Sequence, residues 1–442
     1  MTLKKLKVLI GALLLMLFLT GCVPTVDDLF QLPVPKPEYQ ELQNEITRRL
    51  GEGWELTYPL GGELRTTMHF ADLTGDGREE GVILLRASES SNMSIVTYAD
   101  TGERYEFMTE YLLTGGAFSR IAFNDIDGDG DMEILVGIQY GTEALYNAML
   151  LDLNAETGEL ESLLKVPYTD WLVYNADGDG NDELLILQNS DSSNDATAIL
   201  YAFRDGKAVE LGRAPLSIGV TKPETIVWGR IQTGEVIAVV ESRYYVSGYI
   251  ADPLIFYKGR FFNMGYDPEL KINNNWLMPF LLPAADSDGD GFIELPNPQD
   301  VQNNNGSAYY RIDWFGLEPS GGTEYEFSTY HDTESGWYLV FPAGWRYNLQ
   351  IFTRTDSGGV RRTLFADLSG HTLLECNLYP ARRSNLIPTN NETVIFTVNG
   401  NYLTVVNPRD PDDTERLSLA EARRLLHAVE DVSLPVPSES GE

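Results

Sequence analysis

The sequence predicts a mainly β protein, a five-bladed β-propeller followed by a small α+β domain. A nine-residue acidic loop occurs four times, and short apolar, strand-like runs follow the loops. The loops begin at Asp72, Asp125, Asn175 and Asp286, so that successive starts lie 53, 50 and 111 residues apart. Units of about 50 residues, each made of a few short strands joined by glycine turns, are typical of propeller blades.

The long third step predicts one further repeat that has lost its acidic loop. Residues Val227–Val240 keep the strand-like flanks, but the loop between them is short and lacks the carboxylates. Five blades would then lie between about residues 55 and 333. Because an open row of blades leaves an exposed sheet edge, we expect Trp54–Tyr58 to complete the last blade, formed by Tyr309–Phe315 and Tyr325–Thr329. The alternative is a sixth or seventh blade built from C-terminal strands.

The loops share one pattern of oxygen-bearing residues. Positions 1, 3, 5 and 9 carry oxygen-bearing side chains, and glycine at position 6 permits a sharp turn. Position 7 varies freely, which fits a ligand supplied by the backbone carbonyl. The candidate ligands at positions 1, 3, 5, 7 and 9 are Asp72, Thr74, Asp76, Arg78 and Glu80; Asp125, Asp127, Asp129, Asp131 and Glu133; Asn175, Asp177, Asp179, Asn181 and Glu183; and Asp286, Asp288, Asp290, Phe292 and Glu294.

Hard oxygen ligands in a compact loop predict Ca²⁺ as the cofactor, whereas Mg²⁺ usually keeps several waters. Three loops are complete, and the loop that starts at Asp72 is the weaker fourth candidate. An EF-hand would need a bidentate Glu at position 12. The residues there are Ile83, Val136, Ile186 and Asn297. The loops are therefore expected between strands rather than between helices.

The loops and their flanking strands resemble the FG-GAP or VCBS-type repeats of integrin-α-like β-propellers, over roughly residues 55–330. The resemblance implies that Asp125, Asp127, Asp129 and Glu133, with their counterparts in the other loops, bind Ca²⁺. The chain departs from that family by carrying Glu rather than Asp at position 9. Such a resemblance says little about the binding partner, because propellers have many functions.

The N-terminus predicts export. Residues 1–21 contain three lysines, then the apolar run Val8–Leu19, and Cys22 follows Leu19-Thr20-Gly21. This order is that of a secretory signal peptide. Its end resembles a bacterial lipobox, which implies a lipid on Cys22 and attachment to the outer face of the bacterial cell membrane. The alternative is an ordinary signal peptide with a chance cysteine. Residues 22–50 are expected to form a lipid-anchored, proline-rich tether and a short helix over 38–50.

Residues 334–432 lack the acidic loop and are expected to form the α+β domain. Strands are predicted over 336–341, 348–353, 361–365 and 393–398. A helix is predicted over Leu417–Val429 with Ser418 as its N-cap. Cys376 is expected to be a buried strand residue, and residues 433–442 a disordered tail.

Charge and residue content narrow the function. The formal net charge of −34 argues against nucleic acid and anionic lipid headgroups as partners. The four histidines are scattered, and the dense carboxylate clusters are accounted for by the loops. We therefore expect a non-enzymatic binding or scaffold module for a protein or envelope glycan. The alternative is a carbohydrate-active enzyme that uses a propeller face.

Overall fold

The computed structural model describes residues 40–429, except 141–144, 155–156, 190–195, 205, 246–247, 302–308, 333, 381–388, 390 and 408–415. Over this part the chain is mainly β, and its strands form six antiparallel sheets. The expected signal peptide, Cys22, the proline-rich tether and the tail over 433–442 lie outside the described residues. No helix within the described ranges is long and apolar enough to cross a membrane.

The second and third sheets are meanders of strands that follow one another along the chain. The first sheet contains β1 (Trp54–Leu56), β2 (Met68–Ala71), β3 (Glu80–Ala87), β4 (Asn92–Asp100) and β5 (Tyr105–Thr114), and in it β1 and β2 both pair with β3. The second contains β6 (Ala117–Asn124), β7 (Glu133–Tyr140), β8 (Leu145–Asn154) and β9 (Glu159–Pro167). The third contains β10 (Asp170–Tyr174), β11 (Glu183–Asn189), β12 (Ala196–Arg204) and β13 (Lys207–Leu216).

The expected silent repeat forms the fourth sheet. Its strands are β14 (Val220–Arg230), β15 (Val236–Tyr244), β16 (Tyr249–Tyr257) and β17 (Arg260–Asn263), and β18 (Leu277–Met278) also pairs with β16. The fifth sheet has the order β19 (Leu295–Val301), β20 (Tyr309–Leu317), β21 (Thr323–Asp332), β22 (Trp337–Val340) and β28 (Leu426–Ala428). The sixth has the order β23 (Gln350–Thr355), β24 (Arg361–Ala366), β25 (Thr372–Pro380), β27 (Asn401–Val406) and β26 (Glu392–Val398).

The hydrophobic cores lie between successive sheets. Val82 of β3 and Ile134 of β7 share a core between the first and second sheets, and Leu185 of β11 and Val240 of β15 share another between the third and fourth. A strand covered on both faces needs apolar residues on both. This explains why β3, β7 and β11, the strands that follow the acidic loops, are nearly continuous apolar runs.

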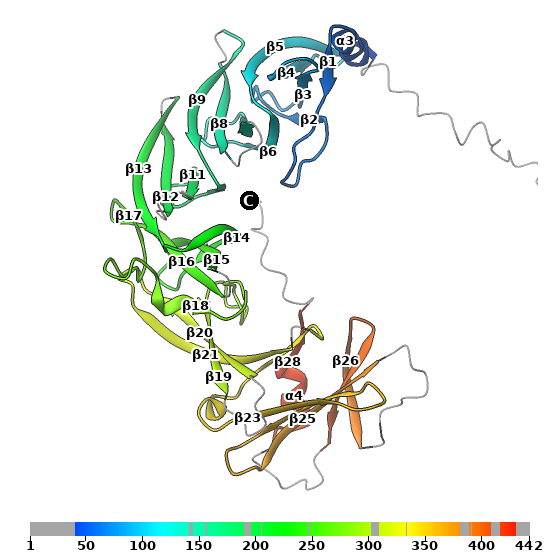
Figure 1. Ribbon diagram of the computed structural model, residues 1–442, viewed down its shortest axis with the longest axis vertical. Helices are drawn as coiled ribbons and strands as arrows, with labels where there is room; N and C mark the ends of the chain where they lie inside the picture. Colours follow the sequence, from blue (N-terminus) through cyan, green and yellow to red (C-terminus); the bar gives the residue numbers. More distant parts are fainter. Residues whose placement is uncertain are drawn as a thin grey trace, which may run out of the picture.

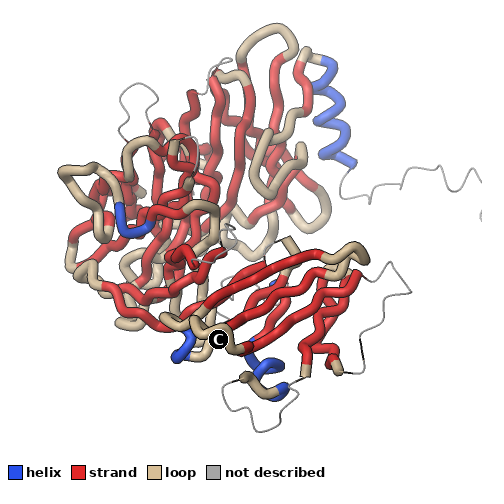
Figure 2. Tube along the Cα trace, turned by 60° about the horizontal axis from the view of Figure 1, so that its bottom comes forward, coloured by secondary structure: helices blue, strands red, loops and turns tan. Residues whose placement is uncertain are grey.

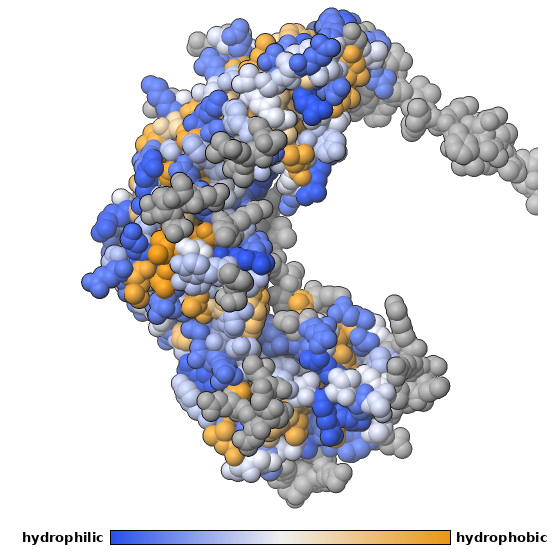
Figure 3. Space-filling model, in the orientation of Figure 1, coloured by the Kyte–Doolittle hydropathy of each residue, from blue (hydrophilic) through white to orange (hydrophobic). Residues whose placement is uncertain are grey.

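The sheets form an open arc rather than a closed ring (Figure 1). The expected closure by Trp54–Tyr58 is wrong, because Leu56 pairs with Leu85 inside the first sheet, on the same edge of β3 as β2. In the space-filling view the two ends of the arc stay apart (Figure 3). The five-bladed closed propeller is thus replaced by an open row of blade-like sheets.

Each end of the row is capped. At the first sheet, helix α3 (Gln40–Gly51) lies beside the strands (Figure 2). Its Leu42 and Ile46 pack against Ile83 and Leu85. At the other end, the fifth and sixth sheets share one core, which includes Trp337, Leu339, Ile351 and Phe365. The two caps cover apolar faces that ring closure would otherwise have to bury.

The C-terminal region contributes strands β22 and β28 to the fifth sheet. β22 pairs with β21, so residues 336–341 supply a strand of that sheet and not a blade of their own. Helix α4 (Leu419–Leu425) has Ser418 as its N-cap, with Glu421 completing a capping box. The helix ends before the expected Val429 because Leu426–Ala428 forms β28 and pairs with β22. Cys376 is buried in β25, as expected, and burial raises the pKa of its thiol.

Candidate metal centres

The four acidic loops are closed by the same hydrogen bond. The first loop connects β2 and β3, the second connects β6 and β7, the third connects β10 and β11, and the fourth leads into β19. The glutamate at position 9 is buried in every loop, and its Oε2 accepts the N–H of the residue at position 2. These donors are Leu73 at 2.9 Å, Ile126 at 2.7 Å, Ala176 at 2.7 Å and Ser287 at 2.8 Å. The end of each loop is thereby tied to its start.

Side chains inside the loops turn the backbone back on itself. The carboxylate of Asp125 accepts the N–H of Gly128 at 2.8 Å, and Asp286 accepts that of Gly289 at 2.8 Å. Such Asx-type bonds favour tight turns. Glycines at positions 4 and 6 have positive φ in all four loops, for example +77° at Gly128. The sequence argument identified this need only at position 6.

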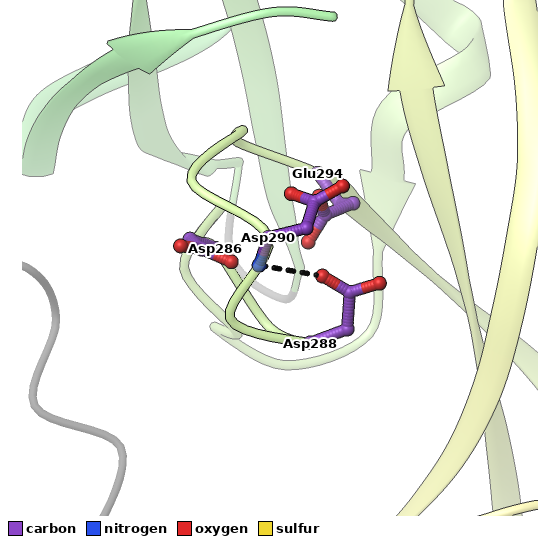
Figure 4. Close-up of side chains that lie close together, drawn as sticks. All are labelled: Asp286, Asp288, Asp290 and Glu294. Carbon is purple, nitrogen blue, oxygen red and sulfur yellow. Dashed lines mark hydrogen bonds between the residues drawn. The ribbon is translucent and has the colours of Figure 1, made fainter.

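Three of the loops gather carboxylate oxygens within 4.8 Å of one another. Figure 4 shows this for Asp286, Asp288, Asp290 and Glu294, where the N–H of Asp290 donates to Asp288 at 3.1 Å. The other groups are Asp125, Asp127 and Glu133; Asp129, Asp131 and Glu133; and Asp177, Asp179 and Glu183. Several acidic clusters could therefore hold a metal ion.

The electrostatics of these groups fit a bound cation. Glu133 Oε1, Asp127 Oδ1 and Glu294 Oε1 are buried and have no hydrogen-bond partner in the described structure. Burial, followed by the charge of nearby carboxylates, raises the pKa of Glu133 to about 9 and of Glu294 to about 8. A cation among these oxygens would satisfy them and favour their ionised form.

The first loop differs from the others. Among the described residues its acids do not form such a group. The Thr74 side chain is hydrogen-bonded to Glu80, and the Arg78 guanidinium donates to the carbonyl oxygen of Asp100 at 3.3 Å, away from the loop. Asp72 Oδ1 is nevertheless buried without a partner in the described structure.

Two acidic residues outside the loops lie close to them and were not identified from the sequence. Burial and then the charge of Asp129 raise the pKa of Asp152, on β8. Burial and then the charge of Asp288, in the fourth loop, likewise raise the pKa of Glu326, on β21. The strand pairing gives the signal that could have found Asp152, because its neighbour Leu151 lies opposite Ile134, next to Glu133.

Loops of adjacent sheets are close neighbours. A Cβ atom placed on Gly128 of the second loop would lie 2.2 Å from Asn181 Oδ1 of the third. One placed on Gly75 of the first loop would lie 3.3 Å from the Gly130 carbonyl oxygen of the second. The first three loops therefore form a continuous row.

Comparison with known proteins agrees on the class of repeat. Residues 72–136, which span the first two loops, match the family described as FG-GAP-like repeat. The fold and the loops together define a mainly β protein with an FG-GAP-like repeat and propeller-like sheets. No curated protein matches the sequence.

Three solved structures are similar to the chain at low identity and low TM-score. A protein from Lactobacillus plantarum is 12% identical with a TM-score of 0.30, covering 71% of this chain and 84% of that one. The Dos1 propeller is 12% identical with a TM-score of 0.28, covering 80% and 81%. The rhamnogalacturonan lyase YesW is 12% identical with a TM-score of 0.30, covering 70% of each chain. Likenesses at this level carry no argument about function.

Proposed function

We propose that this protein is an extracytoplasmic lipoprotein whose calcium-stabilised sheets act as a binding or scaffold module for a protein or an envelope glycan. The observation that carries the proposal is the recurrence of buried, partner-lacking carboxylate oxygens in loops that share one hydrogen-bonding pattern. The basic and apolar leader before Cys22 supports attachment to the outer face of the bacterial cell membrane.

Calcium would be held by the residues at positions 1, 3, 5 and 9 of each complete loop, with the backbone carbonyl at position 7. In the second loop the side-chain ligands would be Asp125, Asp127, Asp129 and Glu133. The ion would supply positive charge among mutually repelling carboxylates and tie each loop to its sheet. Its role is structural, because binding to the folded state alone stabilises that state.

The binding role follows from the architecture. A row of similar sheets, capped at both ends, offers a long surface with loops held in fixed positions, as other repeat proteins do. An enzyme would need an acid–base pair outside the calcium loops. His331 is partly buried and stacked on Tyr338, and desolvation lowers its pKa to about 4. Its position suits packing better than proton transfer at a surface.

Affinity capture tests the proposal. The full-length protein, purified in detergent, is immobilised and exposed to solubilised envelope material in Ca²⁺ or in chelator, and bound proteins and glycans are identified. We expect a specific envelope component that is retained in Ca²⁺ and lost in chelator. Failure to retain any component in Ca²⁺ would contradict the binding role.

A further inference from the structure

An inserted segment between β17 and the fourth acidic loop is anchored firmly to the fourth sheet. It holds the short 3₁₀ helix η2 (Asn274–Trp276) and β18. Just before η2, the buried Asn273 amide donates to Asn263 Oδ1 at 3.1 Å and to the Met264 carbonyl oxygen at 2.6 Å. Its backbone N–H donates to Ser217 Oγ at 2.9 Å. The residues that follow are therefore presented from a fixed base.

A cavity of about 410 Å³ opens where this segment meets the fifth sheet. Residues 274–277 form one side, and Asn297 of β19, Phe315 of β20 and Thr323 of β21 form the other. The volume falls within the range of roughly 300–1,000 Å³ that is usual for small-ligand sites. Three strands and an anchored turn thus contribute side chains to one pocket.

The polar groups that line the pocket are all neutral. Asn274, Asn275 and Asn297 each offer an amide donor and an amide acceptor, and Thr323 offers a hydroxyl. Asn297 is held in place because it donates to the Asn275 carbonyl oxygen at 3.3 Å and accepts from Gln299 at 2.7 Å. Asn274 and Asn275 are exposed, and their side-chain amides make no hydrogen bond within the described structure. These two amides are available to a ligand.

The remaining lining is apolar. Trp276 is buried in the hydrophobic core (3% exposed) and meets the partly buried Phe315 edge to face with ring centroids 5.9 Å apart, so the apolar surface open to a ligand comes from Phe315 and the exposed Leu277. A ligand that fits must therefore offer hydrogen-bond donors and acceptors together with a C–H surface. In a chain of net charge −34, a pocket without a basic residue gives an anion no counter-charge, while cations are drawn to the acidic loops.

We propose that this pocket binds a neutral glycan, through the amides of Asn274, Asn275 and Asn297 and the apolar surface of Phe315 and Leu277. Sugar hydroxyls both donate and accept, as the amides do, and the C–H faces of a sugar ring suit aromatic and aliphatic walls. This inference rests on the proposed binding function and gives a chemical class to one of its ligands.

Calorimetric titration of the full chain with pure sugars tests the pocket. The probes are maltotriose, cellotriose and tri-N-acetylchitotriose, with trigalacturonate as the anionic counterpart. The variants are Asn274→Ala combined with Asn275→Ala, and separately Thr323→Val. Asn92→Ala, at an exposed asparagine that begins β4 in the first sheet, is the matched control. Thermal melts establish that each variant is folded.

We expect at least one neutral sugar to bind, with the double variant about tenfold weaker or more, since its hydrogen bonds to the ligand are lost. Asn92→Ala should bind like the parent chain. Binding of none of the neutral sugars, equal binding of trigalacturonate, or unchanged affinity in both pocket variants would overturn the proposal. The titration uses pure sugars, so a negative result would contradict the glycan pocket alone. The binding function would still be tested by whether the capture experiment retains an envelope protein.

Discussion

The backbone N–H of Met132 donates to the carbonyl oxygen of Asp72 at 2.9 Å. Met132 stands at position 8 of the second acidic loop, and Asp72 opens the first. The two loops belong to adjacent sheets and are joined here by backbone alone. A cation that orders the second loop would therefore also restrain the first, whose own acids are less closely gathered.

Calcium should stabilise the folded chain. Extracellular calcium modules bind at about 10⁻⁴–10⁻³ M, and at a hundredfold excess over its dissociation constant each site would add about 2.7 kcal/mol. We expect the melting temperature to be higher in Ca²⁺ than in chelator, with a smaller effect of Mg²⁺ at the same concentration. Differential scanning calorimetry measures this, and an unchanged midpoint would contradict the assignment of the loops.

Two glycine variants separate the cost of a clash between neighbouring loops from the cost of backbone strain within one loop. Gly128 and Gly178 both stand at position 4 and both have φ of +77°. A Cβ on Gly128 would meet Asn181 Oδ1 at 2.2 Å, whereas one on Gly178 would meet no atom within 4 Å. Gly128→Ala should therefore cost roughly 1 kcal/mol more than Gly178→Ala. Chemical denaturation in chelator compares them; equal losses would show that the loops are energetically independent.

The sequence located the first three sheets well because each acidic loop marks the turn between two paired strands, β2 and β3, β6 and β7, and β10 and β11. Residues 227–240 fit the same spacing without carboxylates, and they form β14, a short turn and β15. The tertiary partners were harder to predict. The sequence predicts a strand over Trp54–Tyr58, but its pattern does not identify the strand's partner, and the observed β1 (Trp54–Leu56) pairs with β3 of its own sheet.

The ligand residues of the acidic loops could be predicted from the sequence, but the neighbours that strand pairing brings to them could not. The C-terminal helix shows the same difficulty elsewhere in the chain. Its helix propensity continues past Leu425, yet pairing with β22 takes residues 426–428 into a sheet. In the same way Asp152 approaches the second loop only through the pairing of β7 with β8. Such contacts depend on register, which single-sequence patterns do not fix.

Glu241 should make stability fall as pH rises. The side chain is buried in β15, where Oε1 accepts the N–H of Ala284 at 2.8 Å, and burial raises its pKa to about 8. In the unfolded chain the carboxyl ionises near pH 4.5, so the stability contributed by its neutral form is full below that pH. It is lost progressively as pH rises toward 8.

Glu241→Gln keeps a hydrogen-bond acceptor and cannot ionise. The difference in the free energy of unfolding between this variant and the parent chain should therefore increase, in favour of the variant, between about pH 5 and 8. The gain should reach a few kcal/mol, since each pKa unit corresponds to about 1.4 kcal/mol. Urea denaturation across this pH range gives the difference. Glu159→Gln, at an exposed residue of β9, serves as the control. A constant difference between Glu241→Gln and the parent would refute the argument.

Asp152→Asn should have opposite effects on the metal-free and metal-bound protein. Burial and then the charge of Asp129 raise the pKa of Asp152 beside the second loop. Removing one charge should raise the melting temperature in chelator and weaken Ca²⁺ binding by several-fold, because the negative potential at the site falls. Asp300→Asn, at an exposed residue of β19, is the control. Calorimetric Ca²⁺ titration with matched melts decides the matter, and tighter Ca²⁺ binding by Asp152→Asn would exclude this role.

Cys22 should determine where the protein resides in the cell. Cys22 lies outside the described residues, and the prediction rests on the basic and apolar leader ending in Leu19-Thr20-Gly21-Cys22. Cys22→Ala removes the thiol that would carry the lipid, so the variant should remain an uncleaved precursor or leave the membrane. Each acyl chain of the lipid buries several methylenes in the membrane, at about 0.8 kcal/mol per methylene, and this holds a lipidated protein at the membrane surface. Fractionation with immunoblotting, and metabolic labelling with a fatty acid, compare parent and variant. A variant recovered as a mature, membrane-bound protein would show that the anchor lies elsewhere.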